Sequence, residues 1–304
     1  MKVSVVIVTY NGDQWIEKVI KSLYSSKIEV KIIIIDNNSF DKTVNLIKKY
    51  DEVDLIELKT NLGFGLANNI GLKKAYEEKF DYVFLLNQDA WINEDTIANL
   101  VIAHQKNSEF GVISPMHLNG KGDALDYKFS KYIVPDKCKN LYSDIFLNKT
   151  VNKIYEVEFV NAAAWLISRN CLEIVGGFNP SFFHYGEDDN YLHRVKFHKL
   201  KIGILADTII YHDREYRISN DYFVNPEKYL KRQLILDFSN PLLSKSFKRE
   251  YKKCCKKLTK AFFLLRIKKV KEYIFEIRVL NKLDKKQIIK NKILSENTSN
   301  SFLT

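Results

Sequence analysis

Three consecutive carboxylates, Glu187, Asp188 and Asp189, follow Tyr185-Gly186 at the start of a segment with helical character. A carboxylate in such a place can act as a general base that accepts the proton of an attacking hydroxyl group. Acidic residues also favour helix N-termini, by ~0.3–1 kcal/mol each. Three in a row, next to His184 and several aromatic residues, exceed what capping requires. The stretch is therefore a candidate catalytic site, with capping as the alternative.

Asp89 and His212 form a second candidate site, because each residue ends a short apolar run. Asp89 closes "VFLLNQD", and His212 closes "IIYHD". Either residue alone is more often structural than functional. Together they offer a carboxylate oxygen and an imidazole nitrogen, which suit Mg²⁺ or Mn²⁺ when a diphosphate supplies further oxygens.

The elements that would position these residues alternate between apolar strands and amphipathic helices. Expected strands cover Val3–Val8, Val30–Asp36, Val53–Leu58 and Tyr82–Leu86, and expected helices cover 13–24, 41–50, a segment ending near Glu78 and one beginning near Glu94. The strands are continuous Val, Ile and Leu runs, which is typical of parallel strands covered on both faces. This order predicts an α/β fold with a doubly wound, mainly parallel sheet.

Short polar residues follow all four of these strands. They are Thr9, Tyr10, Asn11 and Gly12; then Asp36, Asn37, Asn38 and Ser39; then the Gly-rich stretch 61–71; and then Asn87, Gln88 and Asp89. In doubly wound sheets, ligands lie beyond the carboxyl ends of the strands. Polar residues at all four ends therefore favour a ligand site over ordinary turns.

The pattern weakens between residues 111 and 159, where irregular structure such as a flap is expected. It returns with an expected strand at Phe159–Ser168 and a short helix ending at Gly176-Gly177. Next come a helix starting near Glu187 and two short strands, Lys201–Asp207 and Ile209–Asp213.

Six segments in series resemble glycosyltransferase family 2, whose members have the GT-A fold. They are "VSVVIVTYN", "IIIIDNNSFDKT", "NLGFGLANNIG", "LLNQDA", "GGFNPSFFHYGEDDNYLHR" and "IIYHD", within about residues 1–215. The resemblance assigns the nucleotide-sugar site to Thr9, Tyr10, Asn11, Asp36, Asn38, Asn61, Gly65, Asn68, Asn87 and Gln88. It assigns the metal to Asp89 and His212 and the catalytic base to Asp188. Glu187, Asp189, Arg194 and Trp165 would surround the acceptor or support the base, with Arg194 steadying the acidic stretch by an ion pair.

Two positions depart from the family pattern. Asn87 stands where the family has the first acid of its metal motif, which leaves most of the coordination to Asp89. Asn190 stands where a further Asp is usual, which puts the support of the base in doubt. The resemblance otherwise implies an inverting transfer from a nucleoside-diphosphate sugar with Mg²⁺ or Mn²⁺. The stretches "LLNQDA" and "FHYGEDD" look most like the rhamnosyltransferase branch of the family, which suggests dTDP-rhamnose as the donor and leaves UDP-sugars open. The acceptor would be a saccharide, lipid-linked and destined for a surface polysaccharide.

Three other functions remain as alternatives. A non-catalytic module that binds a nucleotide sugar or carbohydrate would not need Asp188 together with Asp89 and His212. A metal-dependent hydrolase built from His184, Glu187, Asp188, His193 and His198 lacks a known ligand spacing. Nucleic-acid binding through a basic tail has no fold signature in the body of the chain, and no nucleic acid is expected.

The formal charge of +11 is concentrated near the C-terminus. Residues 245–292 contain 18 Lys and Arg against 4 Asp and Glu, a net +14, which leaves the remainder near −3. We therefore expect a catalytic domain over 1–215, with a nucleotide-sugar half to about 110 and an acceptor half beyond it. A basic helical extension over 216–304, with a disordered end, would follow.

The spacing of apolar residues in part of this extension predicts one amphipathic helix with an apolar stripe. Its members are Phe263, Ile267, Val270, Ile274, Ile277 and Leu280, surrounded by lysines and arginines. The stripe either packs on the catalytic domain or lies on an anionic membrane surface. On an anionic membrane, the stripe would make the protein peripheral on the inner face of the plasma membrane. Four cysteines without metal-binding spacing and no recognisable leader indicate a reduced, cytoplasmic setting.

Overall fold

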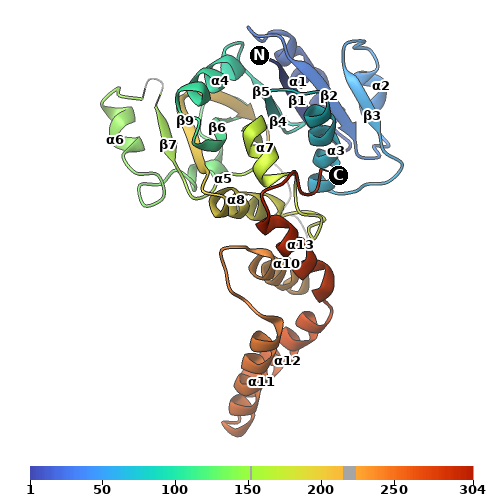
Figure 1. The fold of residues 1–304 in the computed structure, drawn as a ribbon, viewed down its shortest axis with the longest axis vertical. Helices are drawn as coiled ribbons and strands as arrows, with labels where there is room; N and C mark the ends of the chain where they lie inside the picture. Colours follow the sequence, from blue (N-terminus) through green and yellow to red (C-terminus); the bar gives the residue numbers. More distant parts are fainter. Residues whose placement is uncertain (151–152, 215–223, 304) are drawn as a thin grey trace.

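The computed structural model describes residues 1–150, 153–214 and 224–303, and it has two parts. An α/β part contains the whole sheet, and a helical part extends away from it (Figure 1). The sheet has nine strands: β1 (Val3–Thr9), β2 (Lys31–Asp36), β3 (Asp54–Glu57), β4 (Tyr82–Leu86), β5 (Ala90–Ile92), β6 (Phe110–Asn119), β7 (Ile154–Glu156), β8 (Ala164–Ser168) and β9 (Lys201–His212).

The strand order is β3-β2-β1-β4-β8-β6-β9-β5, and β7 pairs with residues 203–205 of β9. Strands β1 to β4, β6 and β9 run in one direction, because β8 is antiparallel to both β4 and β6. The sheet is therefore mainly parallel, as the apolar runs predicted. The order reverses between β1 and β4, and such a switch point is where α/β sheets bind ligands.

Helices cover both faces of the sheet. On one face, α1 (Ile16–Tyr24), α2 (Thr43–Ile47) and α4 (Thr96–Lys106) contribute Ile16, Ile47 and Leu100 to one core. On the other face, α3 (Phe64–Glu77), α7 (Arg169–Val175) and α8 (Glu187–Phe197) contribute Leu72, Leu172 and Leu192 to a second core. Two cores of this kind explain the uninterrupted apolar strands, since each strand must bury side chains on both sides.

The region from 111 to 159 differs from the irregular structure that was expected. It contains β6, which lies between β8 and β9, and also α5 (Tyr127–Ser130), α6 (Leu141–Phe146) and β7. Pro115 and His117 make β6 hard to predict from the sequence. Proline in particular argues against a central strand, because it has no N–H to donate to a neighbouring strand. The structure accommodates this by a register shift between Pro115 and Met116.

The same shift joins the two short strands expected at 201–207 and 209–213. They form the single strand β9, whose register with β6 passes from Leu205 directly to Ile209. In contrast, the strand expected from Phe159 begins only at Ala164. All four cysteines are free thiols in this structure.

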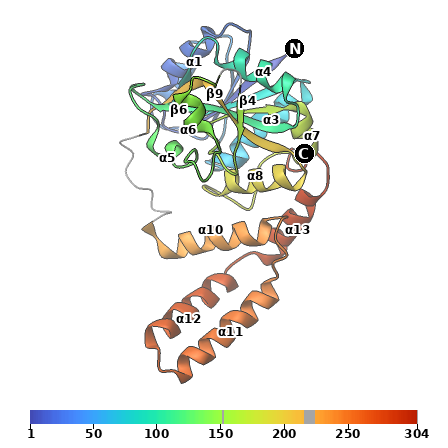
Figure 2. The ribbon, with the colours of Figure 1, turned by 90° about the vertical axis from the view of Figure 1, so that its left-hand side faces the viewer.

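The helical part consists of α10 (Pro226–Ser239), α11 (Phe247–Phe263), α12 (Ile267–Asn281) and α13 (Lys285–Glu296). It has a small core of its own, in which Leu234, Phe238, Leu280 and Ile288 pack with Phe182 of the α/β part. Helices α10 and α13 lie next to α8, whereas α11 and α12 form a hairpin that points away from the sheet (Figure 2).

Two expectations for this part are wrong. The stripe does not lie on one helix, because the chain turns at 264–266, so that Phe263 ends α11 and Ile267 begins α12. The end of the chain is not disordered through 303, since α13 is helical and Leu303 is only 3% exposed against the second core. Among the described helices, none is long and apolar enough to cross a membrane.

Candidate active site

Gln88 links the carboxyl ends of β1 and β4 at the switch point of the sheet. Its Oε1 accepts hydrogen bonds from Thr9 Oγ1 at 2.7 Å and from the Tyr10 backbone N–H at 2.8 Å. Its Nε2 donates to the Tyr10 carbonyl at 3.2 Å. The structure thus brings together Thr9, Tyr10 and Gln88, while Asn87 continues the strand end through a backbone bond to Ala163.

Loops after β1, β2 and β3 form the rest of this edge. The Asn11 N–H donates to Ser39 Oγ, and Asn11 Oδ1 accepts from the Phe40 N–H. Asp36 is 2% exposed; its Oδ2 accepts the Ser39 N–H, whereas its Oδ1 has no hydrogen-bond partner among the described residues. A buried, unpaired carboxylate oxygen is costly unless a ligand donor reaches it. Asp36 therefore fits the predicted contact with a nucleoside.

Asn37, which was noted at the end of β2 but was given no role in the site, organises this loop. Its Nδ2 donates to Asn61 Oδ1 at 3.0 Å, and its Oδ1 accepts the Leu62 N–H at 2.8 Å. Asn38 is exposed with a φ of 69°, a left-handed conformation that asparagine tolerates. Asn68 lies deeper, where its Nδ2 donates to the Phe64 carbonyl within α3. Asn68 consequently has a helix-internal role in this structure.

Glycines in the loop before α3 allow the loop before α8 to approach closely. Gly63 has a φ of 81°, and a Cβ there would lie 1.9 Å from the Phe183 carbonyl oxygen. A Cβ on Gly65 would lie 3.1 Å from Phe178 Cβ and 3.4 Å from Glu187 Cβ. Gly65, which was predicted to bind the nucleotide sugar, thus packs beneath the acidic stretch. This contact places the start of α8 at the carboxyl edge of the sheet.

Asp89 and His212 are brought together by the pairing of β5 with β9. Asp89 immediately precedes β5, and the first residue of that strand, Ala90, is the partner of His212. Both side chains are buried, and His212 Nε2 lies 3.5 Å from Asp89 Oδ1. Two residues 123 positions apart, 212 minus 89, therefore meet as the sequence predicted.

The surroundings of His212 fit a divalent cation. Its side chain is fully buried, yet neither ring nitrogen has a hydrogen-bond partner among the described residues. The 3.5 Å separation of Nε2 from a carboxylate oxygen exceeds hydrogen-bonding distance but suits two ligands of one ion. Because an imidazole and a carboxylate are both ligands that Mn²⁺ and Mg²⁺ accept, Asp89 and His212 would hold such an ion.

Asp126 and Arg214 support this pair and were missed by sequence reasoning. The Arg214 guanidinium donates to both carboxylate oxygens of Asp126 at 2.6 Å, and Asp126 Oδ2 lies 3.6 Å from His212 Nδ1. A carboxylate behind a metal-binding histidine orients the ring. Burial opposes ionisation of Asp126, but the hydrogen bond and charge of Arg214 help to lower its pKa below the usual value. Arg214 could have been found from the sequence, because it lies two residues after His212. Asp126 lies between residues 111 and 159, where the sequence shows no clear pattern.

The three acidic residues occupy the first turn of α8, after Gly186 with a φ of 100°. Glu187 is 4% exposed, while Asp188 and Asp189 are half-buried. Burial first, and then the charge of Asp189, raises the pKa of Asp188 above its usual range. Burial likewise raises the pKa of Glu187, and the charge of Asp188 adds to this. A carboxylate with a raised pKa is a stronger base once ionised, as proton abstraction requires.

Tyr132 is a partly buried residue whose ring packs edge to face on Phe129 and Phe159. Burial raises the pKa of its phenol to about 12, and the charges of Asp188 and Arg214 act on that pKa in opposite directions. Tyr132 was not predicted, because a single tyrosine in an irregular region carries no motif.

Arg194 does not pair with the carboxylates as predicted, and Asn190, the departure from the family pattern, has a partner outside the acidic stretch. Asn190 Nδ2 donates to Ser239 Oγ at 3.0 Å, so this residue ties α8 to α10 of the helical part. The Arg194 guanidinium is fully buried and donates to the backbone carbonyls of Gly177, at 2.6 Å, and Val175. The predicted ion pair is therefore wrong: Arg194 anchors the turn after α7.

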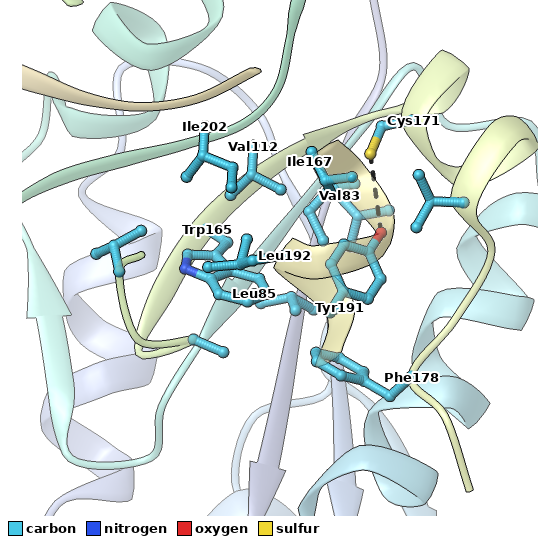
Figure 3. Close-up of a cluster of buried hydrophobic side chains, with 14 of the residues drawn as sticks. Val83, Leu85, Val112, Trp165, Ile167, Cys171, Phe178, Tyr191, Leu192 and Ile202 are labelled. Carbon is cyan, nitrogen blue, oxygen red and sulfur yellow. Dashed lines mark hydrogen bonds between the residues drawn. The ribbon is translucent and has the colours of Figure 1, made fainter. Parts of the chain in front are cut away.

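Trp165 is also in a different environment from the acceptor site that was predicted. It is 0% exposed, and its ring stacks on Phe178 at a centroid distance of 6.2 Å. Figure 3 shows it packed among Leu85, Leu192, Tyr191 and Phe178 in the core. Trp165 lies on β8, whose residues are buried on both faces, and the whole ring is consequently taken up by core packing.

The hydrolase alternative receives no support from the structure. Its residues His184, Glu187, Asp188, His193 and His198 do not include three ligand atoms within 4.8 Å of one another in the described part of the chain. His198 instead contacts the Ser295 carbonyl oxygen at 3.0 Å.

The anchoring role of Arg194 leads to a stability prediction. Arg194→Lys should lower the free energy of unfolding by about 1–3 kcal/mol, because a lysine cannot satisfy both buried carbonyls. Arg169→Lys is the matched control: Arg169 is partly exposed, pairs with Glu173 and donates to one carbonyl, that of Tyr76, so the substitution should cost less, under about 1 kcal/mol. Urea unfolding measures both. Equal shifts in the two midpoints would show that Arg194 is no anchor.

Comparisons with known proteins agree with this geometry. The sequence profile described as "Glycosyl transferase family 2" matches residues 4–173, which is more than half of the chain. The low-salt glycan biosynthesis hexosyltransferase Agl10 of Haloferax volcanii is 26% identical over 249 residues, covering 79% of this chain and 74% of its own length. The poly(ribitol-phosphate) beta-N-acetylglucosaminyltransferase TarS of Staphylococcus aureus is 25% identical over 82% of this chain but only 42% of its own.

Solved structures show the same fold. TarS residues 1–349 from S. aureus in complex with UDP-GlcNAc match with a TM-score of 0.56 and 16% identity, covering 97% of this chain and 90% of that one. GalNAc-T7 with UDP, GalNAc and Mn²⁺ matches with a TM-score of 0.57 and 17% identity, covering 79% and 51%. With its switch-point site, its mainly parallel sheet and the matched profile, the chain belongs to glycosyl transferase family 2 and has the GT-A fold.

Proposed function

We propose that this protein transfers a sugar from a nucleoside-diphosphate sugar to a saccharide acceptor with inversion at the anomeric carbon. The observation that supports the proposal is that the start of α8, with Glu187 and Asp188, packs against the loop before α3 at the carboxyl edge of the sheet, the edge at which Asp89 follows β4. A non-catalytic binding module has no use for a base in that position. Family membership supports the same conclusion.

Asp188 acts as the general base in this proposal. Its carboxylate takes the proton of the acceptor hydroxyl, whose oxygen attacks the anomeric carbon as the bond to the diphosphate breaks. A single displacement from the opposite face inverts the configuration. Burial and the charge of Asp189 hold the pKa of Asp188 high.

The nucleotide end of the site is formed by Asp36, Thr9, Tyr10, Asn11 and Gln88. Asp36 offers its Oδ1 to the nucleoside, and the exposed ring of Tyr10 lies 6.0 Å from that of Phe40, where a base can stack. Asp89 and His212 hold Mg²⁺ or Mn²⁺, which when bound neutralises the charge of the departing diphosphate. The Mn²⁺ in the GalNAc-T7 structure supports this assignment.

The donor is a UDP-hexose in this proposal, because the TarS structures contain UDP or UDP-GlcNAc. The resemblance in sequence pointed to dTDP-rhamnose, and this donor is the second arm of the same test. The acceptor is a saccharide of a surface glycan, carried on a lipid. Relatives named for glycan biosynthesis and for poly(ribitol-phosphate) support a polymer acceptor. A peripheral position on the cytoplasmic face of an anionic membrane belongs to this proposal.

A donor screen by thermal shift tests the proposal without knowledge of the acceptor. With Mn²⁺ present, UDP-hexoses should raise the Tm by several degrees, because a ligand stabilises the state that binds it. Asp36→Asn should remove most of that rise while leaving the Tm of the free protein nearly unchanged. Binding of dTDP-rhamnose alone would overturn the UDP assignment, and binding of no nucleotide sugar would overturn the function.

A further inference from the structure

The closed end of the α11–α12 hairpin exposes a continuous apolar surface. This tip consists of Phe262, Phe263, Leu264, Leu265 and Ile267, whose side chains are 66%, 78%, 49%, 85% and 70% exposed. In both views the tip is the part of the molecule farthest from the sheet (Figures 1 and 2). With a 17-residue helix leading to it, the tip projects by about 25 Å at 1.5 Å per residue. Contiguous apolar patches on soluble proteins mark interaction surfaces.

The backbone conformation at the tip is unusual for large apolar residues that face water. Leu265 has a φ of 50°, in the left-handed region that glycine or asparagine usually occupies at a helix end. Around it, only Ala261 is buried, so the large side chains bury little apolar surface within the protein itself. An apolar environment that covered them would therefore stabilise this turn.

Positive charge surrounds the tip on both helices. From Lys256 to Lys271 the chain carries seven Lys or Arg and no Asp or Glu. The six lysines among them are all exposed, as is Arg266 at the turn itself. An apolar end with a ring of cations matches the boundary between headgroups and acyl chains of an anionic bilayer. A second copy of the chain is a poor partner, because two such tips would bring their cations together.

We propose that the hairpin tip inserts into an anionic lipid bilayer, with the five apolar side chains below the headgroups and the flanking lysines on the phosphates. Insertion of the tip deepens the proposed function. It rests on that function only for its purpose, because attachment to the bilayer would bring the enzyme to a lipid-carried acceptor. It replaces the flat-lying helix that the stripe suggested, since Leu280 at the end of α12 is buried in the core of the helical part.

Truncation is unsuitable as a test, because α13 and Leu303 pack back on the α/β part. Instead, full-length protein carrying Phe262→Ser, Phe263→Ser and Leu265→Ser is floated with vesicles of phosphatidylcholine and phosphatidylglycerol. The matched control replaces Ile145, Phe146 and Leu147 with serine, since these are equally large side chains exposed on or beside α6. We expect the tip variant to partition at least about tenfold more weakly than the wild type, and the control to stay within about twofold.

A single Phe263→Trp variant distinguishes insertion from adsorption. Its added fluorescence should shift to the blue on binding and be quenched by lipids brominated on the acyl chains. A variant with Lys256, Lys260 and Lys268 changed to glutamine should bind less, and salt should weaken wild-type binding.

Wild-type partitioning by the tip variant, or no binding of the wild type to anionic vesicles at low salt, would overturn the proposal. A dimer in solution that the tip variant dissociates would also overturn it and assign the tip to a second copy. Donor-induced thermal shift of the tip variant should equal that of the wild type. Failure of insertion and failure of the proposed transferase function are therefore separate results.

Discussion

Asp188→Asn is expected to lower kcat by about 10²–10⁴-fold while the affinity for the donor changes by less than about threefold. Asparagine has the same shape as aspartate but cannot accept the proton of the acceptor hydroxyl. The environment of Asp188, in which burial and Asp189 raise its pKa, increases its basicity and thus the size of the expected loss. Steady-state transfer to a saccharide acceptor, with donor affinity from calorimetry, measures both quantities.

Asp189→Asn is the matched control, because it makes the same chemical change at the next position of α8. Its N–H donates to Asp188 Oδ1 at 2.9 Å, a bond through the backbone that the substitution leaves in place. We therefore expect kcat to fall by less than about tenfold. Turnover of Asp188→Asn at the wild-type rate would disprove the role of the base. A greater loss in Asp189→Asn would move that role to Asp189.

Removal of divalent cations should abolish transfer, and added Mn²⁺ or Mg²⁺ should restore it. Asp89→Asn should weaken Mn²⁺ binding by at least about 100-fold, since the amide that replaces the carboxylate carries no charge. Electron paramagnetic resonance of bound Mn²⁺ reports this without reference to activity. The buried position of Asp89, 1% exposed, means that no water-exposed carboxylate can easily replace it.

Asp144→Asn serves as the control for the loss of a nearly buried carboxylate. Asp144 is 9% exposed on α6 and accepts a hydrogen bond from Tyr155 at 2.7 Å, within the α/β part but outside the residues assigned to the site. Its substitution should reduce stability but leave the affinity for Mn²⁺ unchanged. Transfer that persists in excess chelator, or equal Mn²⁺ affinity in wild type and Asp89→Asn, would contradict the metal assignment.

The first half of the fold was predictable because its signals are local. Strands β1, β2 and β4 consist mainly of apolar runs, and the polar residues that follow the strands identify the edge at which they meet. The meeting of Asp89 with His212 was also predictable, although only through the family resemblance. Nothing in the spacing of two residues 123 positions apart indicates that β5 pairs with β9.

Features that depend on long-range packing were not predictable. Strand β6 contains Pro115, and it is held in the sheet by neighbours on both sides and not by its own propensity. Arg194 follows the acidic residues by one or two helical turns, so an ion pair was the natural expectation. The structure instead buries it against carbonyls of the preceding turn, which no pattern in α8 reveals. Trp165 shows the same limit, because its burial depends on residues from three other segments.

The contact between residues 299–303 and the turn after α7 bears on how the chain is made. The Gly177 N–H donates to the Ser301 carbonyl at 2.8 Å, and the Ser299 N–H donates to Ile174. A ribosome must add 124 residues (301 minus 177) after Gly177 before that partner exists. During this interval the sheet can form, but the Gly176-Gly177 turn lacks the contacts that Ser301 and Leu303 later supply. Long sequence separation slows closure and lengthens the exposure of unfinished surfaces. Newly synthesised chains should consequently pass through a stage that chaperones recognise, and refolding should end with a slow docking of this last segment.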